Sequence, residues 1–217
     1  MPDIHAHDHA TGGVGDLGAY ALFRLFQSES QRAHFSLGLT MPSGAVDIED
    51  RRTHQEDQGF THYMMQLGSG TWDLAPSVTW SGRLARFSFG AQLSGVKRLQ
   101  PENESGYALG DVFQATLWGS WSASHWLSLS ARGLYTMQRR IQGEYDGPHT
   151  TSGPMDFPSS YGGQFWDLGL GVSASLPFRS LDGNRLSLEW LQPLQDDMNG
   201  YQLERRGTLV FRWSVEL

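Results

Sequence analysis

Three histidines alternate with other residues near the start of this 217-residue chain, at His5, His7 and His9. Neutral imidazole is a good ligand for copper, nickel and zinc, and a flexible histidine-rich tract can bind such ions without fixed geometry. The alternative interpretation is a polar segment that is rich in histidine and binds no metal. We therefore treat residues 1–14 as a histidine-rich leader or loop, with metal binding by these three side chains as one hypothesis.

Two serine–histidine pairs raise the question of hydrolysis. His34 and Ser36 lie on one face of an expected strand, and Ser124 and His125 are adjacent in an expected turn. A hydrolase also needs a third residue to orient the base, and neither pair suggests one; the sequence also has no Gly-x-Ser-x-Gly elbow. We therefore expect that the chain is not an enzyme. A lipid-modifying barrel enzyme stays an alternative, because such barrel enzymes use serine and histidine.

Charged residues form the third group of candidates, because they fall among otherwise small and polar positions of alternating segments. A charged lining can select or orient a solute inside a pore. The alternative is a structural network of ion pairs, since charges removed from water must be paired. The candidate lining residues are Asp16, Arg24, Arg32, Asp73, Arg86, Arg132, Asp167, Glu189, Glu204, Arg206 and Arg212.

The elements that must position these side chains are strands, because apolar and polar residues alternate strictly along the chain. Phe35, Leu37 and Leu39, for example, alternate with polar or small residues. A period of two indicates a strand with two different faces. The pattern predicts nine strands, at 15–27, 32–41, 71–81, 83–96, 110–121, 126–140, 164–177, 185–192 and 203–217.

The expected connections alternate between short and long. This is the rule of outer-membrane barrels, which have tight periplasmic turns and long external loops. Short connections are expected near 28–31, 81–84, 121–125 and 178–184. Long connections are expected near 42–70, 97–109, 141–163 and 193–202.

Two further features favour a membrane barrel over a soluble sandwich. The expected strands are about ten or more residues long, which is the length that a tilted strand needs to cross a bilayer. Their apolar face carries almost no charge, Arg205 being the exception, and its aromatic residues lie toward the strand ends. Amphipathic rings prefer the level of the lipid headgroups, so these aromatics are typical of two girdles. We expect the apolar face to contact lipid and the polar face to surround a lumen.

Composition excludes other classes of protein. The chain has no cysteine and a formal net charge of −7, which argues against a disulfide framework and against a nucleic-acid binder. No run approaches the roughly 18 apolar residues of a membrane-spanning helix. The first residues lack a signal peptide, which taken alone predicts a cytoplasmic protein and conflicts with the strand pattern.

Several short segments resemble one known family. They are Gly13-Val14-Gly15-Asp16-Leu17, Gly38-Leu39-Thr40-Met41-Pro42-Ser43-Gly44, Gln66-Leu67-Gly68-Ser69-Gly70-Thr71-Trp72-Asp73 and Leu188-Glu189-Trp190-Leu191-Gln192-Pro193-Leu194, with Asn199-Gly200 and Gln202-Leu203-Glu204 after the last. Together they resemble the outer-membrane transporter family associated with the meta-pathway of phenol degradation, over nearly all of 12–217. The resemblance implies a membrane β-barrel with a transport role, and it supplies no catalytic residues.

The resemblance also suggests why a barrel sequence shows an odd strand count and no signal peptide. Members of that family are longer at the N-terminus, with a signal peptide and further strands, and bacterial single-chain barrels have even strand numbers. We therefore expect an all-β, antiparallel up-and-down transmembrane β-barrel, with about nine strands present of about twelve. Residues 15–217 would form the barrel, incomplete at its N-terminus and open or poorly closed.

The function that we expect is a passive channel or transporter in the bacterial outer membrane. Its partners would be outer-membrane lipid and a small solute, with aromatic or hydrophobic molecules suggested by the family resemblance. We expect no cofactor and no nucleic-acid partner, and we predict no oligomeric state. The alternatives are a metal-associated outer-membrane protein with a histidine-rich loop and a lipid-modifying barrel enzyme.

Overall fold

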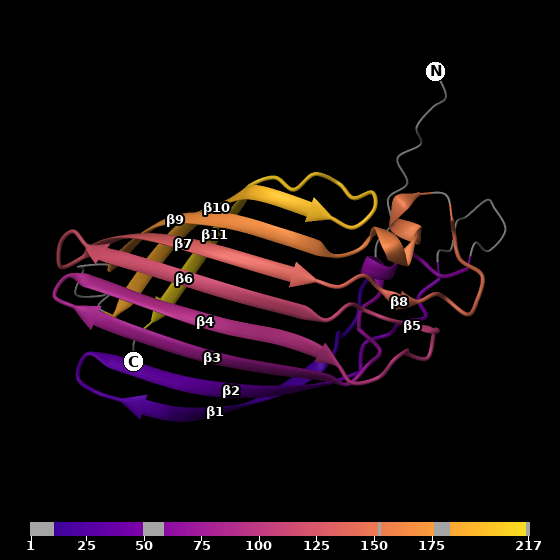
Figure 1. Ribbon diagram of the computed structural model, residues 1–217, viewed down its shortest axis with the longest axis horizontal. Coiled ribbons are helices and arrows are strands. Elements are labelled where there is room, and N and C mark those ends of the chain that lie inside the picture. The colour runs from indigo at the N-terminus through magenta and orange to yellow at the C-terminus, as the bar shows by residue number, and fades with distance from the viewer. Residues whose placement is uncertain (1–10, 50–58, 152, 176–182, 216–217) are drawn as a thin grey trace, which may run out of the picture.

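The computed structural model describes residues 11–49, 59–151, 153–175 and 183–215. Nine long strands form one antiparallel sheet, and each pairs with the next long strand along the chain (Figure 1). The strands are β1 (Leu17–Gln27), β2 (Gln31–Met41), β3 (Asp73–Leu84), β4 (Phe87–Arg98), β6 (Val112–Ser122), β7 (Leu127–Gln138), β9 (Gly163–Ser175), β10 (Asn184–Met198) and β11 (Thr208–Val215). The predicted all-β, up-and-down architecture is confirmed.

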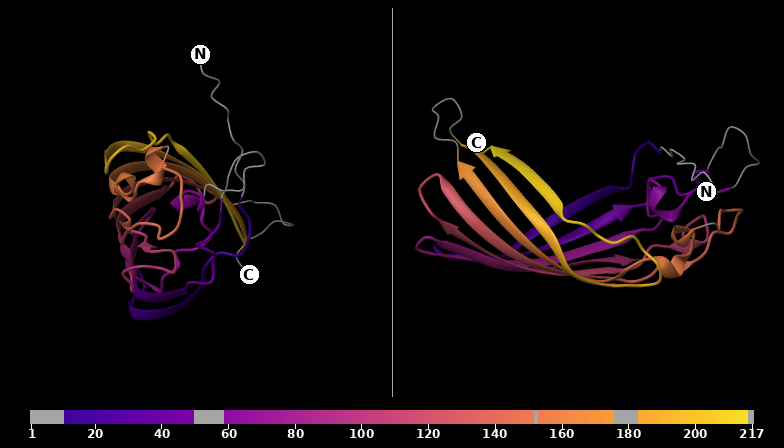
Figure 2. Two further views of the ribbon diagram at one scale, coloured as in Figure 1. Left: turned by 90° about the vertical axis from the view of Figure 1, so that its right-hand side faces the viewer. Right: turned by 90° about the horizontal axis from the view of Figure 1, so that it is seen from above.

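The sheet curves into a trough (Figure 2). Within the described residues, β1 and β11 each pair along one edge only, so the sheet has an open seam between its first and last strands. This agrees with the expectation of an open barrel. Among the helices that the structure describes, none is long and apolar enough to cross a membrane.

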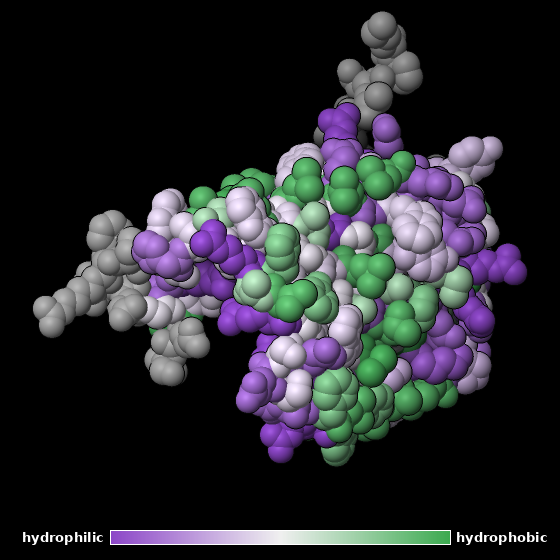
Figure 3. All heavy atoms as spheres, turned by 60° about the vertical axis from the view of Figure 1, so that its left-hand side comes forward, coloured by the Kyte–Doolittle hydropathy of each residue, from purple (hydrophilic) through white to green (hydrophobic). Residues whose placement is uncertain are grey.

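The apolar face of the sheet points outward and the polar face points into the trough. In β9, Trp166, Leu168 and Leu170 are 50%, 37% and 57% exposed, whereas Phe165 and Asp167 are each only 8% exposed. Hydrophobic residues accordingly cover much of the wall surface (Figure 3). A soluble barrel fills its interior with apolar side chains, so this arrangement is inverted relative to a soluble protein.

Short turns join the strands at one end of the trough, and the β3–β4 turn differs from its prediction. The strands pair as far as Leu84 and Phe87, so the turn consists of Ala85 and Arg86 rather than residues 81–84. Ala85 has a φ of +53°, the left-handed conformation of a tight turn. The expected strand 83–96 therefore begins later than predicted, and the lining candidate Arg86 lies in the turn rather than on a strand.

The end of β10 also differs from its prediction. Pro193 pairs with Asp167 and Gln195 with Trp166, which leaves Leu194 as an extra residue in a bulge. The bulge lets β10 continue to Met198, six residues beyond the end expected at 192. β11 begins at Thr208 rather than 203, so the residues before it do not follow the alternation of the strand.

Long loops gather at the other end of the trough and fold over its concave side (Figure 2). They contain the short strands β5 (Tyr107–Ala108) and β8 (Gln142–Gly143), which pair with each other. They also contain three 3-10 turns, η1 (Tyr63–Met65), η2 (Pro154–Asp156) and η3 (Pro158–Ser160). The predicted alternation of short turns and long loops is confirmed for the described connections.

Candidate functional site: the trough and its loop core

Small hydroxyl and amide side chains line much of the trough and bond to one another across neighbouring strands. The Ser36 and Ser77 hydroxyls lie 2.7 Å apart, and the Ser173 hydroxyl donates to Ser187 at 2.9 Å. The amide of Gln92 donates to the Thr79 hydroxyl at 2.9 Å. A lining of this kind cannot form a hydrophobic core, so it suits a water-filled space.

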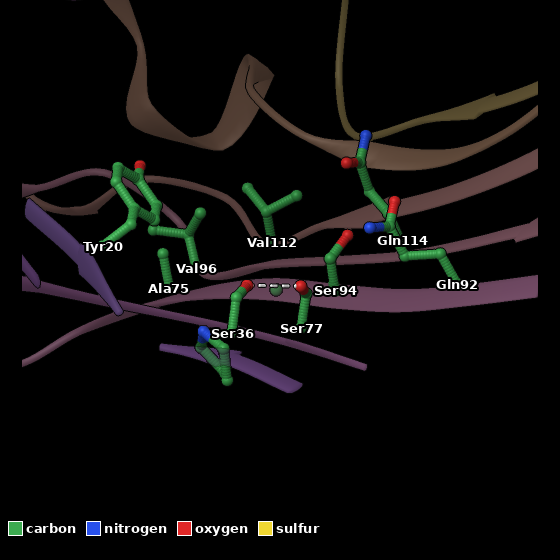
Figure 4. A pocket seen from close by; sticks show the side chains of 11 residues that line it. Tyr20, Ser36, Ala75, Ser77, Gln92, Ser94, Val96, Val112 and Gln114 are labelled. Carbon is green, nitrogen blue, oxygen red and sulfur yellow. Dashed lines mark hydrogen bonds between the residues drawn. The ribbon is translucent and has the colours of Figure 1, made fainter. Parts of the chain in front are cut away.

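A hollow of about 230 Å³ lies on this lining over β1 to β6. Tyr20, Ser94 and Gln114 point into it with the bonded Ser36–Ser77 pair (Figure 4). Its walls combine an aromatic ring with neutral hydrogen-bonding groups. The hollow is therefore suited to a small uncharged or weakly polar group.

One predicted lining pair is an ion pair across a strand. The Nε and Nη2 atoms of Arg132 in β7 donate to the two carboxylate oxygens of Glu189 in β10, at 3.0 and 2.6 Å. Gly169 of the intervening β9 leaves the space for this contact, because a Cβ there would lie 2.5 Å from the Glu189 carboxylate. The pairing is bidentate, which is the strongest geometry for this type of contact.

A second charged group near the loop end includes a residue that sequence analysis misplaced. Arg205 was assigned to the apolar face, but its guanidinium donates to Asp167 at 2.9 Å and also to Asp196. It also lies over the Phe165 ring, 4.6 Å from its centroid. Because Arg205 precedes β11, strand alternation does not govern the direction of its side chain.

Asp73 begins β3 and is buried in a third charged group. Its carboxylate accepts the Thr71 hydroxyl at 2.7 Å, the Ser69 hydroxyl at 3.0 Å and the Arg98 guanidinium. Burial of this carboxylate is therefore compensated by several donors. Arg98 was not among the predicted lining residues, although it occupies a polar-face position opposite Asp73.

Asp16 lies just before β1 and fastens a loop to the sheet. One carboxylate oxygen accepts the Gly44 backbone N–H at 2.9 Å. The other accepts the Ser69 backbone N–H at 2.7 Å. Asp16 thus holds the loop that follows β2, rather than presenting a free charge.

The remaining candidate lining residues are exposed and separate into two groups. Arg24, Arg32 and Arg212 lie on the concave face near the turns. Glu204 and Arg206 lie in the irregular segment before β11, outside the strands. The structure therefore brings together Asp73, Arg132, Asp167 and Glu189 with basic or acidic partners, and leaves the exposed arginines without carboxylate partners among the described residues.

The loops enclose an aromatic core of their own. We call it the loop core: Tyr63, Tyr107, Ile141 and Tyr145, with Phe60, Leu109 and Tyr161 packed against it. Tyr63 stacks on Tyr145 with ring centroids 4.4 Å apart, and Tyr107 meets both rings edge-on at 4.8 and 5.0 Å. Aromatic pairs at these separations stabilise a cluster beyond their buried area.

Polar contacts tie the loop core to its surroundings. The Tyr145 hydroxyl donates to the Thr61 carbonyl at 3.0 Å and accepts the Gln66 amide at 3.0 Å. The His62 ring nitrogen and an Asp156 carboxylate oxygen lie 2.5 Å apart, which joins two loops distant in sequence. The core therefore fixes three long loops as one body over the mouth of the trough.

The loop core is expected to melt at alkaline pH. Burial raises the pKa of Tyr63 and Tyr161 to about 12, and it also raises the pKa of Tyr107 and Tyr145. An unfolded tyrosine ionises near pH 10. Above that pH the unfolded loops release protons that the folded core retains, so the stability of the core is full below pH 10 and falls as the pH rises toward 12.

Tyrosine absorbance at 295 nm and near-ultraviolet circular dichroism measure this transition. We expect the four core tyrosines to ionise late, together with loss of the near-ultraviolet signal. Ionisation of all seven tyrosines in a single step near pH 10, with the signal intact, would contradict the buried core.

The residues proposed for metal binding and for hydrolysis have different outcomes. His5, His7 and His9 lie outside the described residues. Within 11–49, 59–151, 153–175 and 183–215, no three His, Asp or Glu side chains come together as a metal site. The Ser36 hydroxyl bonds to Ser77, and the Ser124 hydroxyl accepts the Leu127 backbone N–H at 3.1 Å, so each serine has a structural partner.

Comparison with known proteins finds a similarity in fold. No protein-family model matches the chain, and no curated protein matches it in sequence. The fold is similar to the crystal structure of the COG4313 outer membrane channel from Pseudomonas putida F1, with a TM-score of 0.58 and 15% sequence identity. The match covers 94% of this chain and 65% of that chain, so this chain spans less than two thirds of the channel's length. At this identity the likeness supports the fold.

Proposed function

We propose that the chain forms the wall and mouth of a passive channel in the bacterial outer membrane. The observation that carries the proposal is the inverted polarity of the sheet, with leucine and tryptophan outside and serine, threonine, glutamine and paired charges inside. A lipid bilayer is the environment in which an apolar exterior is stable. A polar interior is not stable without water, so it provides an aqueous path for solutes.

Strand length and aromatic placement support a bilayer as the surroundings. An 11-residue strand such as β1 rises about 36 Å, which spans about 25 Å of bilayer when it is tilted by about 45°. On the outer face near the loops, Phe113, Tyr135 and Trp166 form a row, with centroids 6.4 and 4.7 Å apart. Near the turns, Trp80 and Phe89 lie 5.5 Å apart. Two aromatic rows match the two headgroup levels.

In a bilayer, the open seam between β1 and β11 must be closed by further strands. Unpaired backbone groups facing hydrocarbon cost several kcal/mol each, so neither edge is stable in lipid alone. We infer that about three further strands close the seam, giving roughly twelve in all. The fold similarity to a longer outer membrane channel supports this interpretation.

The solute and family are part of the same proposal. We infer that the chain belongs to the outer-membrane transporter family associated with the meta-pathway of phenol degradation, whose motifs it resembles. Small solutes, including aromatic or hydrophobic ones, would diffuse past the loop core and along the hydroxyl-lined trough. The hollow beside Tyr20 provides an aromatic contact with neutral hydrogen-bonding groups around it.

Planar-bilayer recording tests the channel directly. The protein as the cell makes it, purified from outer membranes and reconstituted, is expected to give discrete conductance steps in potassium chloride. Heat-denatured protein from the same preparation is the control and should give none. Absence of steps from protein that retains its β-sheet circular dichroism would overturn the channel proposal.

A further inference from the structure

Five arginines gather on the concave face at the end of the trough where the short turns lie. We call them the turn-end arginines: Arg24 of β1, Arg32 of β2, Arg83 of β3, Arg185 of β10 and Arg212 of β11. Four of them pair in register with serines of the polar face, namely Ser81, Ser88, Ser175 and Ser187. The fifth, Arg24, pairs with His34 on the same face. Their strand positions therefore direct all five into the trough.

Register also places the turn-end arginines close together in two groups. Arg24 lies opposite His34, two residues from Arg32, and Arg32 lies opposite Ser81, two residues from Arg83. Such diagonal neighbours have Cα atoms about 7–8 Å apart. Across the seam, Arg212 lies opposite Ser187, two residues from Arg185. The two groups thus flank the open seam from both sides.

The charge of the turn-end arginines is not neutralised within the described part of the chain. The Arg24 guanidinium donates to Gln27 at 3.2 Å and the Arg32 guanidinium to Ser81 at 3.2 Å, and both acceptors are neutral. None of the five forms an ion pair with a described carboxylate, and all five side chains are exposed. Acidic residues are also scarce near these arginines. In the described turns, and in the five strand residues that flank each turn on either side, Glu29 is the only acidic residue.

The opposite end of the trough has a different electrostatic character. There Asp73 is held by Arg98, and Asp167 and Asp196 are held by Arg205. Arg98 balances the charge of Asp73, whereas Arg205 balances only one of its two carboxylate partners, so this end of the trough keeps a negative charge and the basic charge is confined to the turn end. Uncompensated basic side chains that face a confined aqueous path raise the local concentration of anions.

We propose that the turn-end arginines form an anion-binding site in the channel and that small organic carboxylates are the solutes that this site selects. This inference rests on the proposed channel function. Guanidinium binds carboxylate in a bidentate manner, and diagonal arginines on adjacent strands can contact one carboxylate group from two sides. The lipid phosphate groups of the membrane contact the outer face, whereas these five positions face the trough.

The test measures ion selectivity in a potassium chloride gradient across a phosphatidylcholine bilayer. We expect the native protein to prefer chloride over potassium, and citrate at millimolar concentration to reduce the chloride current. The double variant Arg32→Gln with Arg212→Gln should lower the chloride-to-potassium permeability ratio about threefold and weaken the citrate effect. The Arg32→Lys, Arg212→Lys variant should keep the chloride preference while losing part of the citrate block.

A matched control and a second lipid separate the possible outcomes. Arg86→Gln with Arg140→Gln removes the same charge from a turn and from a loop, and should leave selectivity unchanged. Conductance without chloride preference, or an equal change of the permeability ratio in this control, would overturn the anion-binding site but not the channel. Loss of chloride preference when phosphatidylglycerol is added would assign the arginines to lipid phosphate. Absence of conductance in the folded native protein would instead count against the channel itself.

Discussion

Replacing Leu117 by lysine is expected to destabilise the membrane-inserted protein by about 2–4 kcal/mol, whereas lysine at the adjacent Thr116 should leave insertion largely intact. Leu117 is at the middle of β6, points outward and is 67% exposed. A lysine there would place an ammonium group in the centre of the hydrocarbon. Thr116 lies on the opposite face, in register with Gln92, where an ammonium group stays in the aqueous trough.

Refolding into phosphatidylcholine vesicles measures the difference. The eight tryptophans report insertion by fluorescence, and a urea titration gives the free energy of unfolding for each variant. The two variants each introduce one lysine at neighbouring positions, so each is the control for the other. Equal loss of stability at both positions, or a larger loss at Thr116, would contradict the outward orientation of the apolar face.

The orientation of Leu117 and Thr116 could be predicted because strand side chains alternate with a period of two. Every long strand of the described structure corresponds to a predicted segment, and no long strand was missed in the described residues. Errors fall where alternation stops. Ala85 is a small apolar residue two positions before Phe87, so the alternation of β4 extends back into the turn and conceals it. At β10 the reverse holds: the extra residue Leu194 interrupts the alternation, so the strand was expected to end at 192 although it continues to Met198.

Ion-pair partners could not be read from the sequence because they join positions far apart in the chain. Arg132 and Glu189 are 57 residues apart, and Arg205 reaches Asp167 from 38 residues away. Alternation gives the face on which a charge lies, and the register of three or more strands decides which charges meet. Arg132 and Glu189 form an ion pair, as expected for a structural network. Arg32 and Arg212 have no carboxylate partner among the described residues, so the structural interpretation does not account for them.

The loop core was not predicted, although the sequence held a signal for it. Tyr63, Tyr107, Tyr145 and Tyr161 all fall within or at the edge of the expected long loops. Solvated loops are usually poor in large aromatic residues, so this concentration could have indicated a second core. Which loops pack together still depends on the order of the strands, since the three loops become neighbours only when the sheet forms.

Replacing Tyr107 by alanine is expected to open the mouth of the proposed channel. Tyr107 is fully buried and contacts the rings of both Tyr63 and Tyr145. Truncating a buried aromatic residue to alanine typically costs about 3–5 kcal/mol, and the loops have no other described aromatic core to retain their packing. The wall strands do not depend on this ring, because their stability comes from backbone pairing with neighbouring strands.

Conductance and tyrosine titration together measure this effect. The Tyr107→Ala channel should show a conductance increased severalfold and tyrosines that ionise close to pH 10, while its β-sheet circular dichroism is retained. Tyr107→Phe keeps the ring and its edge-on contacts, so it should behave as the native channel does. An unchanged conductance in Tyr107→Ala, despite earlier tyrosine ionisation, would mean that the loop core melts without governing passage. In that case the narrowest part of the path lies elsewhere in the trough.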